Sequence, residues 1–388
     1  MGAINYAATG LAPGGPEKVS SITPKLILLA LSVGVSFAFL EAALRIVDPL
    51  PARVRGNTLR LSTNIKVVFE NTGIPRMDPK IVVTRNSLGF RGPEMPPDYA
   101  RKLSVLTVGG STTECHYISD GGTWPDLLAG RLSTSIPDLW LNNAGLDGHS
   151  TFGHSYLLRQ VVIPLKPKVV IFLIGINDVG RTTTSISDQA LEDCTRCSLG
   201  RKLFSLIVEN SEVAGTALNL HRAWRAGRRG LTHRVVDLRN SPRKDHVSTP
   251  AEITLLHHQH EHALEGYRQR VQRLVGLCRS NGIVPILITQ PALFGSGREP
   301  VTGIQLDTVV STDDGLDGLT AWTVLEWYND VVRETGKAQH VAVVDLAHEL
   351  PKNFDYFYDF IHYTNKGAAA VAEIVACDLG PYLRKLPR

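Results

Sequence analysis

Two hydrophobic patterns alternate along the chain from about residue 101 onwards. Short, strongly apolar runs are typical of buried strands, and they occur at residues 102–108, 139–144, 168–175, 283–290 and 340–346. Segments with helical apolar spacing occur at residues 123–135, 152–164, 251–282, 319–336 and 365–383. Strands that alternate with helices indicate a parallel sheet covered on both faces. Because crossovers are right-handed, the sequence predicts a three-layer α/β/α sandwich with a doubly wound, mostly parallel, five-stranded sheet.

An uncharged apolar run lies near the amino terminus. It covers residues 26–40, follows Lys25 and precedes Glu41. If Glu41 sits at a headgroup interface, the run extends to Leu44, and about 20 residues are enough to cross a bilayer. We therefore expect a transmembrane anchor at 25–47, with a cleaved signal peptide or a buried core helix as the alternatives.

The basic residues around this run leave its orientation open. Lys18 and Lys25 precede it, and four arginines follow it: Arg45, Arg53, Arg55 and Arg60. The count weakly favours placing the large domain inside the cytoplasm, but long domains translocate largely regardless of charge.

Composition changes divide the rest of the chain. Residues 1–24 are rich in Gly, Ala, Pro and Ser and are expected to form a disordered tail. Residues 48–100 contain many prolines and are expected to form a linker or accessory segment with short strands. Residues 101–388 form the main domain, and the regular pattern breaks at about 181–250, which indicates an irregular insertion.

The overall composition is that of an ordinary globular protein, with 43% hydrophobic and 20% charged residues. A net charge of only +4 gives no overall nucleic-acid footprint. The strongly basic stretch HRAWRAGRRGLTHR, residues 221–234, favours a solvated face or mobile loop, with binding to an acidic polymer or lipid headgroup as the alternative.

The five cysteines do not form a disulfide framework. Cys194 and Cys197 make a lone CxxC, which lacks the second pair of a zinc ribbon. A local disulfide, free thiols, and a metal or redox role all remain open for this pair. The other cysteines are Cys115, Cys278 and Cys377.

Four polar segments lie just after predicted strands or just before the last helix. They are Gly109–Thr113, Asn142–Gly148, Gly175–Asp178 and Asp359–His362. In doubly wound sheets, ligands bind beyond the carboxyl ends of the strands. We therefore expect the four segments to meet at one edge of the sheet.

The first and last segments contain the residue types of a nucleophilic site. A serine such as Ser111 needs a base to take its proton, and His362 is a suitable base. Asp359 lies three residues earlier, so that both side chains share one face of a turn and the carboxylate could orient the imidazole.

The other two segments contain candidate donors for an oxyanion. These are the Asn177 side-chain amide and the Gly148 backbone N–H, together with the backbone N–H of Ser111 itself. Glycine allows close approach of a substrate to its N–H. Gly145 is a less favoured alternative to Gly148.

In order, spacing and flanking strands, these segments resemble the signature blocks of the SGNH hydrolases, or GDSL-type esterases and lipases, from about residue 101 to 383. The resemblance implies a flavodoxin-like fold and an SGNH hydrolase domain at 101–388. Ser111 would be the nucleophile, Asp359 and His362 the rest of the triad, and Ser111, Gly148 and Asn177 the oxyanion hole.

The G-D-S-L motif reads Gly109-Gly110-Ser111-Thr112 here, so its aspartate is absent. Membrane-anchored bacterial members often read G-G-S-T, and the segment NSLGFRG at 86–92 also resembles them. Their catalytic domain is usually outside the cytoplasm, which favours a single-pass bacterial membrane protein with an extracytoplasmic catalytic domain, against the charge count.

The expected function is therefore hydrolysis of an ester, such as an acetyl group on a cell-envelope glycan or a lipid ester. The alternatives are an O-acyltransferase on the same triad and a non-catalytic carbohydrate-binding or assembly module. No metal or organic cofactor is required, no nucleic-acid partner is expected, and the membrane is contacted through the amino-terminal helix.

Several other residues have weaker claims to a functional role. His258 and His262 have the spacing of a metal pair, but an exposed helix start is the favoured interpretation. Gln290 could face the site, and Asp178 is expected to steady its loop. Packing or surface roles are favoured for the remaining candidates, which are His116, His149, His154 and the aromatic stretch FDYFY at 354–358.

Overall fold

The protein was analysed as a computed structural model that describes residues 22–47, 54–55, 58–183, 188, 199–228, 235–310 and 315–387. The disordered tail was expected at 1–24, but its last three residues are helical, because α1 (Ile22–Val47) begins at Ile22. Three other segments lie outside the described residues: 1–21, the CxxC pair Cys194 and Cys197, and the basic residues 229–234.

The centre of the protein is one five-stranded, all-parallel sheet with the strand order β6-β5-β7-β8-β9. Its strands are β5 (Leu103–Gly109), β6 (Leu139–Asn143), β7 (Val169–Leu173), β8 (Val284–Ile288) and β9 (Ala342–Val344). Parallel strands covered on both faces are apolar along their whole length, which is why short apolar runs identified all five. The predicted doubly wound sandwich is confirmed.

Helices cover both faces of the sheet, and each face has its own hydrophobic core. One core contains Val105 and Ile171 of the sheet and joins α3 (Trp124–Ser133) to α11 (Asn365–Leu383). Because successive side chains of a strand point to opposite faces, Leu106 and Val170 belong to the second core. That core is covered by α4 (Thr151–Leu157), α8 (Pro250–Ser280) and α9 (Gly318–Gln339).

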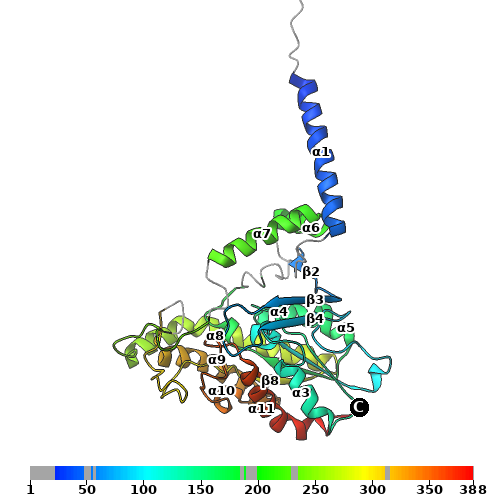
Figure 1. Cartoon of the computed structure of the whole chain (residues 1–388). Coiled ribbons are helices and arrows are strands. Elements are labelled where there is room, and N and C mark those ends of the chain that lie inside the picture. Colours follow the sequence, from blue (N-terminus) through cyan, green and yellow to red (C-terminus); the bar gives the residue numbers. More distant parts are fainter. Residues whose placement is uncertain are drawn as a thin grey trace, which may run out of the picture.

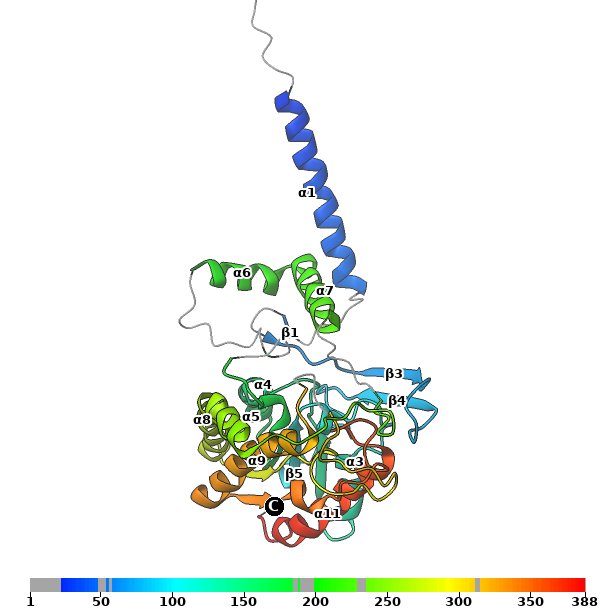
Figure 2. The same ribbon diagram turned by 90° about the vertical axis from the view of Figure 1, so that its left-hand side faces the viewer.

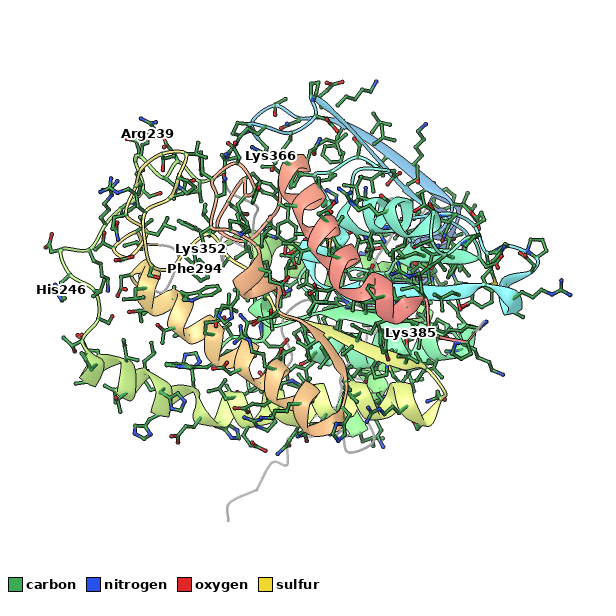
Figure 3. The ribbon with its side chains drawn as sticks, turned by 90° about the horizontal axis from the view of Figure 1, so that it is seen from below. Arg239, His246, Phe294, Lys352, Lys366 and Lys385 are labelled. Carbon is green, nitrogen blue, oxygen red and sulfur yellow. The ribbon has the colours of Figure 1, made fainter. Side chains whose placement is uncertain are left out.

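Helix starts are marked by hydroxyl and carboxylate caps. The 31-residue helix α8 begins with a capping box, in which the Thr249 hydroxyl accepts from the Glu252 N–H and the Glu252 carboxylate accepts from the Thr249 N–H. Its packing partner α9 begins at the N-cap Asp317, whose carboxylate accepts from the Thr320 N–H. The two helices lie side by side in Figure 3.

The segment before the sheet is more ordered than a linker. It contains the short pair β1 (Val54–Arg55) and β2 (Thr58–Leu59), then an antiparallel hairpin of β3 (Ile65–Glu70) and β4 (Lys80–Arg85). Arg91 then forms an isolated bridge with Asn143 at the end of β6, with backbone hydrogen bonds of 3.0 and 2.8 Å. The segment is therefore attached to the edge of the sheet beside the polar end of β6.

A long apolar helix, α1 (Ile22–Val47), projects away from the sheet domain (Figure 1). Pro24–Val47 is long and apolar enough to cross a membrane, with a mean hydropathy of 2.2 in its most apolar 18-residue window. A signal sequence near the amino terminus would pass the same test.

The expectation of an irregular insertion at 181–250 was wrong for its central part. The structure has two helices there, α6 (Leu199–Asn210) and α7 (Glu212–Arg228), which lie between α1 and the sheet domain (Figure 1). The remaining short helical segments are η1 (Tyr99–Arg101), α2 (Ser111–Glu114), η2 (Leu158–Val162), α5 (Ile163–Leu165), η3 (Ile176–Asp178) and α10 (Leu346–Glu349).

Candidate active site

Ser111 lies at the tight turn that leaves the central strand β5. The strand ends at Gly109, Gly110 is the N-cap, and Ser111 is the first residue of α2. A Cβ on Gly109 would lie 2.1 Å from Thr113 Oγ1 and 2.7 Å from the carbonyl oxygen of Leu173. Only glycine fits there, so the sequence forces the turn that presents Ser111 at the carboxyl end of the sheet.

Ser111, His362 and Asp359 form one hydrogen-bonded chain. His362 Nε2 lies 2.7 Å from Ser111 Oγ, and His362 Nδ1 lies 2.6 Å from Asp359 Oδ2. The second oxygen of Asp359 accepts from the backbone N–H groups of Ile361 and His362, at 2.8 and 2.7 Å. The structure therefore brings together a hydroxyl, an imidazole and a carboxylate from sequence positions some 250 residues apart.

The Asp359 carboxyl group is held in its ionised form. Burial pushes its pKa up, but the charge of the His362 imidazolium and the hydrogen bonds to this carboxylate outweigh burial, so that the net pKa lies below the usual value. An ionised carboxylate fixes Nδ1 of the ring as the protonated nitrogen and leaves Nε2 to accept the serine proton.

Asn177 and His149, the residue after Gly148, meet beside Gly110. The Asn177 side chain belongs to η3, directly after β7, and its Nδ2 donates to the carbonyl oxygen of His149 at 2.9 Å. A Cβ placed on Gly110 would lie 2.2 Å from Asn177 Nδ2 and 3.2 Å from that same carbonyl oxygen. The amide therefore occupies the space that the aspartate of a G-D-S-L motif would need.

The backbone N–H groups distinguish Gly148 from Gly145. The Gly145 N–H donates to Asn143 Oδ1 at 2.8 Å. The Ser111 and Gly148 N–H groups have no hydrogen-bond partner within the described part of the chain. Gly148 has a φ of +71°, a conformation in which glycine is favoured. Two unoccupied N–H groups and one amide thus lie in the segments that surround Gly110.

Glu114 and Arg85 connect the serine turn to the Gly148 loop, and sequence reasoning missed both. Glu114 is the last residue of α2 and is buried. Its carboxylate forms an ion pair with Arg85 of β4 and accepts a hydrogen bond from the Asp147 N–H. The residue before Gly148 is therefore held by the same short helix that starts with Ser111.

Arg91 provides a second connection from the NSLGFRG segment. Its guanidinium is buried and donates to the carbonyl oxygens of Glu114, Cys115 and Ile118, at 2.7, 2.8 and 2.7 Å. It also pairs with Asp120 at 2.8 Å. The carbonyl groups that end α2 thus receive hydrogen bonds from a side chain that precedes the sheet. The sequence did not predict this role of Arg91, and showed only that the segment around it is rich in turn residues.

Asp178 holds the Asn177 loop against α4, as expected of a loop-steadying residue. Its carboxylate accepts from the backbone N–H of Thr151 at 3.0 Å and pairs with Arg270 of α8 at 3.2 Å. Arg270 also donates to the Thr151 hydroxyl at 2.7 Å. Arg270, like Glu114, Arg85 and Arg91, is a supporting residue that the sequence did not identify.

A row of aromatic rings leads from β3 to the imidazole. Phe69 stacks on His116, with ring centroids 5.3 Å apart, and Tyr117 follows at 5.1 Å. Tyr358, which the FDYFY stretch supplies, continues the row at 6.0 Å and stacks on His362 at 5.5 Å. Phe69, His116 and Tyr117 are half-buried, so their side of the site is partly open.

A small apolar cluster lies next to the Asn177 and His362 loops. It is formed by Phe294, Ala292, Ala321 and Leu325. Ile176, Phe360 and Ile361 pack against it, and these residues flank Asn177 and separate Asp359 from His362. Lys352 covers this cluster (Figure 3), with its Nζ 3.1 Å from the centroid of the Trp322 ring. Burial lowers the pKa of Lys352 to about 7.

The remaining candidates take structural positions. Gln290 is buried and accepts from the hydroxyl of Thr112, the residue after Ser111, at 3.1 Å. His154 is buried, and burial lowers its pKa to about 4. His258 is exposed and pairs with Glu261 at 2.8 Å. Among the described residues, no group of three or more His, Cys, Asp and Glu side chains could hold a metal ion.

Structural comparison gives distant likenesses, and no curated protein sequence matches the chain. An alpha/beta hydrolase enzyme from the metagenome of Lake Arreo, LAE5, is 17% identical, with a TM-score of 0.41, over 72% of this chain and 96% of that one. A GDSL-like lipase from Parabacteroides merdae is 12% identical, with a TM-score of 0.42, over 74% and 99%. The acetylxylan esterase Axe2 from Geobacillus stearothermophilus is 16% identical, with a TM-score of 0.40, over 71% and 93%.

A family model gives the decisive comparison. The model of the GDSL-like Lipase/Acylhydrolase family matches residues 107–370, which include every segment of the site and all the strands from β6 to β9. The chain therefore belongs to the GDSL-like lipase/acylhydrolase family and is a carboxylic ester hydrolase.

Proposed function

We propose that Ser111 is the nucleophile of this ester hydrolase, that His362 is its general base and acid, and that Asp359 orients the imidazole. The hydrogen-bonded chain from Ser111 Oγ through the His362 ring to Asp359 carries the proposal, with links of 2.7 and 2.6 Å. A serine hydroxyl becomes an effective nucleophile only when a base within hydrogen-bonding distance can take its proton.

The proposed reaction has two halves. Ser111 Oγ attacks the ester carbonyl carbon while its proton passes to His362 Nε2, and the tetrahedral intermediate collapses as the imidazolium protonates the departing alkoxide. A water molecule, deprotonated by the same nitrogen, then attacks the acyl-serine, and the acid product leaves with Ser111 reprotonated. Asp359 stabilises the imidazolium in both halves and stays ionised throughout.

The Ser111 and Gly148 N–H groups and the Asn177 amide would hold the oxyanion. Support comes from the two unoccupied N–H groups and from the contact between Asn177 and the Gly110 position. Donors already in place lower the barrier because no reorganisation is needed when charge develops on the oxygen.

The substrate we propose is a glycan that carries a small acyl group, such as acetyl. The apolar cluster beside the site is already filled by its own side chains and covered by Lys352, which disfavours a long acyl chain. The half-buried rings of Phe69, His116 and Tyr117 offer flat apolar surfaces for a sugar ring.

The proposed location is a membrane, with α1 as a single span and the catalytic domain on the extracytoplasmic side. The length and hydropathy of Pro24–Val47 support a span, as does the exposure of its apolar side chains. Labelling of the exposed thiol of Cys377 by a membrane-impermeant maleimide in intact spheroplasts tests the side. A thiol that reacts only after lysis would place the domain inside.

The nucleophile is tested in the full-length protein with p-nitrophenyl acetate. We expect Ser111→Ala to lower kcat by about 10⁴-fold or more, because the triad acts as a unit. Ser133→Ala is the control, since Ser133 is an exposed serine of α3 that only bonds a carbonyl of its own helix. An unchanged rate in Ser111→Ala would refute the assignment, and a sugar acceptor added to the assay separates transfer from hydrolysis.

A further inference from the structure

The end of α1 is tied to the corner between α6 and α7. Glu41 of α1 accepts hydrogen bonds from the backbone N–H groups of Glu212 and Val213, at 2.8 and 3.1 Å, and from the Ser211 hydroxyl at 2.9 Å. The N–H groups of Glu212 and Val213 are the first donors of α7, which have no partner within that helix. A carboxylate at this end of a helix is also favoured by the helix dipole.

Arg45 holds the other side of the same corner. It lies one turn after Glu41, with which it forms an ion pair at 3.0 Å. Its guanidinium also donates to the carbonyl oxygen of Asn210, the last residue of α6, at 2.9 Å. A cation there complements the negative end of α6. Glu41 and Arg45, one turn apart on α1, therefore cap the start of α7 and the end of α6.

The apolar side of α6 is uncovered. Its five large apolar side chains are each about half exposed or more: Leu199, Leu203, Phe204, Leu206 and Ile207. Four of them recur at helical three- and four-residue spacing and share one face: Leu199, Leu203, Leu206 and Ile207. Phe204 is exposed at the edge of this face, whereas Val208, off the face, is buried. Aliphatic clusters of this size on a water-facing helix mark a surface that binds something apolar.

The position of α6 indicates what covers it. Glu41 and Arg45 follow the uncharged run of α1, so the corner that they hold lies where the apolar span ends. Figure 2 shows α6 and α7 across this end of α1, between the span and the sheet domain. An amphipathic helix at this level meets the boundary between headgroups and acyl chains.

The charge of α7 fits the same surface. Its sequence ends in HRAWRAGR, which contains Arg222, Arg225 and Arg228 and no acidic residue. A basic helix that lies at a membrane surface is attracted to anionic lipid headgroups.

We propose that α6 and α7 form a membrane-surface element, in which α6 buries its exposed apolar face in the headgroup–acyl boundary of an anionic bilayer. Glu41 and Arg45 would fix this element to the end of α1, so that the sheet domain is held at the membrane by two contacts rather than by one flexible tether. The proposal rests on α1 being a membrane span, and it is independent of the catalytic residues.

Tryptophan quenching by brominated lipids tests the proposal in the full-length chain. The protein is reconstituted into vesicles of phosphatidylcholine and phosphatidylglycerol that are brominated either near the headgroup or near the chain ends. Three variants are compared after subtraction of the wild-type emission from its five tryptophans. They are Phe204→Trp on α6, Phe37→Trp within α1, and Leu255→Trp, at an exposed position of α8 in the sheet domain.

We expect the emission added by Phe204→Trp to be quenched by roughly half with lipids brominated near the headgroup and much less with the deep label, as for an interfacial helix. Phe37→Trp should be quenched by the deep label, and Leu255→Trp by neither. If Phe37→Trp is quenched while Phe204→Trp behaves like Leu255→Trp, α6 does not bind the membrane although α1 spans it. If Phe37→Trp is not quenched either, α1 does not span the membrane, and this proposal is refuted as well.

The alternative to the membrane is a second copy of the chain that packs against the apolar face of α6. In that case the Phe204→Trp emission would respond to the ratio of protein to lipid and not to the position of the bromine, and the proposal would be overturned. Leu203→Glu combined with Ile207→Glu gives an independent measure in the Phe204→Trp background. Charges on the apolar face should abolish the shallow quenching while p-nitrophenyl acetate hydrolysis stays unchanged, because the face is remote in sequence and contacts from the site.

Discussion

At the scale of single residues, Gly110 and Asn177 are in close contact, in a serine motif that lacks its aspartate. A Cβ at Gly110 would lie 2.2 Å from Asn177 Nδ2. Because this atom is the end of a flexible side chain, a movement of the Asn177 amide would relieve the clash. A side chain at position 110 would therefore act on the site through the position of Asn177.

Gly110→Ala should consequently damage activity more than stability. We expect kcat/KM for p-nitrophenyl acetate to fall by about 10²-fold, the loss typical of one misplaced oxyanion donor. The free energy of unfolding should change by only about 1 kcal/mol, because the one contact closer than 3.0 Å that the new Cβ makes is with the end of the flexible Asn177 side chain. Gly130→Ala on α3, where nothing lies within 4 Å of the new Cβ, should leave the rate unchanged. A Gly110→Ala enzyme with the full rate would remove Asn177 from the proposed oxyanion hole.

The site residues divide into those that the sequence could indicate and those that it could not. Ser111, Asp359 and His362 could be indicated because parallel strands bring the segments after them to one edge, whatever the details of packing. Arg91 and Arg270 could not, since their roles depend on which carbonyls and carboxylates lie near a buried guanidinium. Such contacts are set by tertiary packing, and no local spacing encodes them.

At the scale of elements, the NSLGFRG segment is part of the serine turn, because Arg91 satisfies the carbonyls that end α2. Arg91→Met should lower the free energy of unfolding by about 3 kcal/mol, since three buried carbonyls and Asp120 lose their donor together. Arg131→Met is the matched control. Arg131 forms an exposed ion pair with Glu373, and its loss should cost less than about 1 kcal/mol. Urea unfolding followed by circular dichroism measures both, and equal losses would mean that Arg91 adds nothing beyond a surface charge.

The regular elements were easier to predict than the insertion for a physical reason. The five strands are apolar throughout because both of their faces are covered, and α8 carries its own capping box. The helix α6 has helical spacing at Leu199, Leu203 and Leu206, but its apolar face is not turned toward a protein core. Its neighbours in sequence lack a pattern, and the contacts that hold it come from Glu41 and Arg45, more than 150 residues earlier.

At the scale of the whole molecule, the sheet is shared by two hydrophobic cores, one on each of its faces. Val105 and Ile171 face one core while Leu106 and Val170 face the other. Loss of packing on either face leaves the same strands half-exposed, so the two cores should be lost together. The proposed catalytic site depends on both cores, because α11 follows His362 on one face and Asp178 is held by α8 on the other.

Two buried thiols report separately on these cores. Cys115 belongs to the core under α3 and α11, and Cys278 belongs to the core under α8 and α9. Burial raises the pKa of both thiols to about 12, so neither should react with a maleimide in the native protein, whereas the exposed Cys377 should react at once. Pulsed labelling across a urea series, read by mass spectrometry of the peptides, should show Cys115 and Cys278 becoming reactive at the same urea concentration, because a sheet buried on both faces unfolds as one unit. If Cys278 reacted at clearly lower urea than Cys115, the face with α8 and α9 would open alone, and the hold of Arg270 on Asp178 would be lost while Ser111 stayed in place.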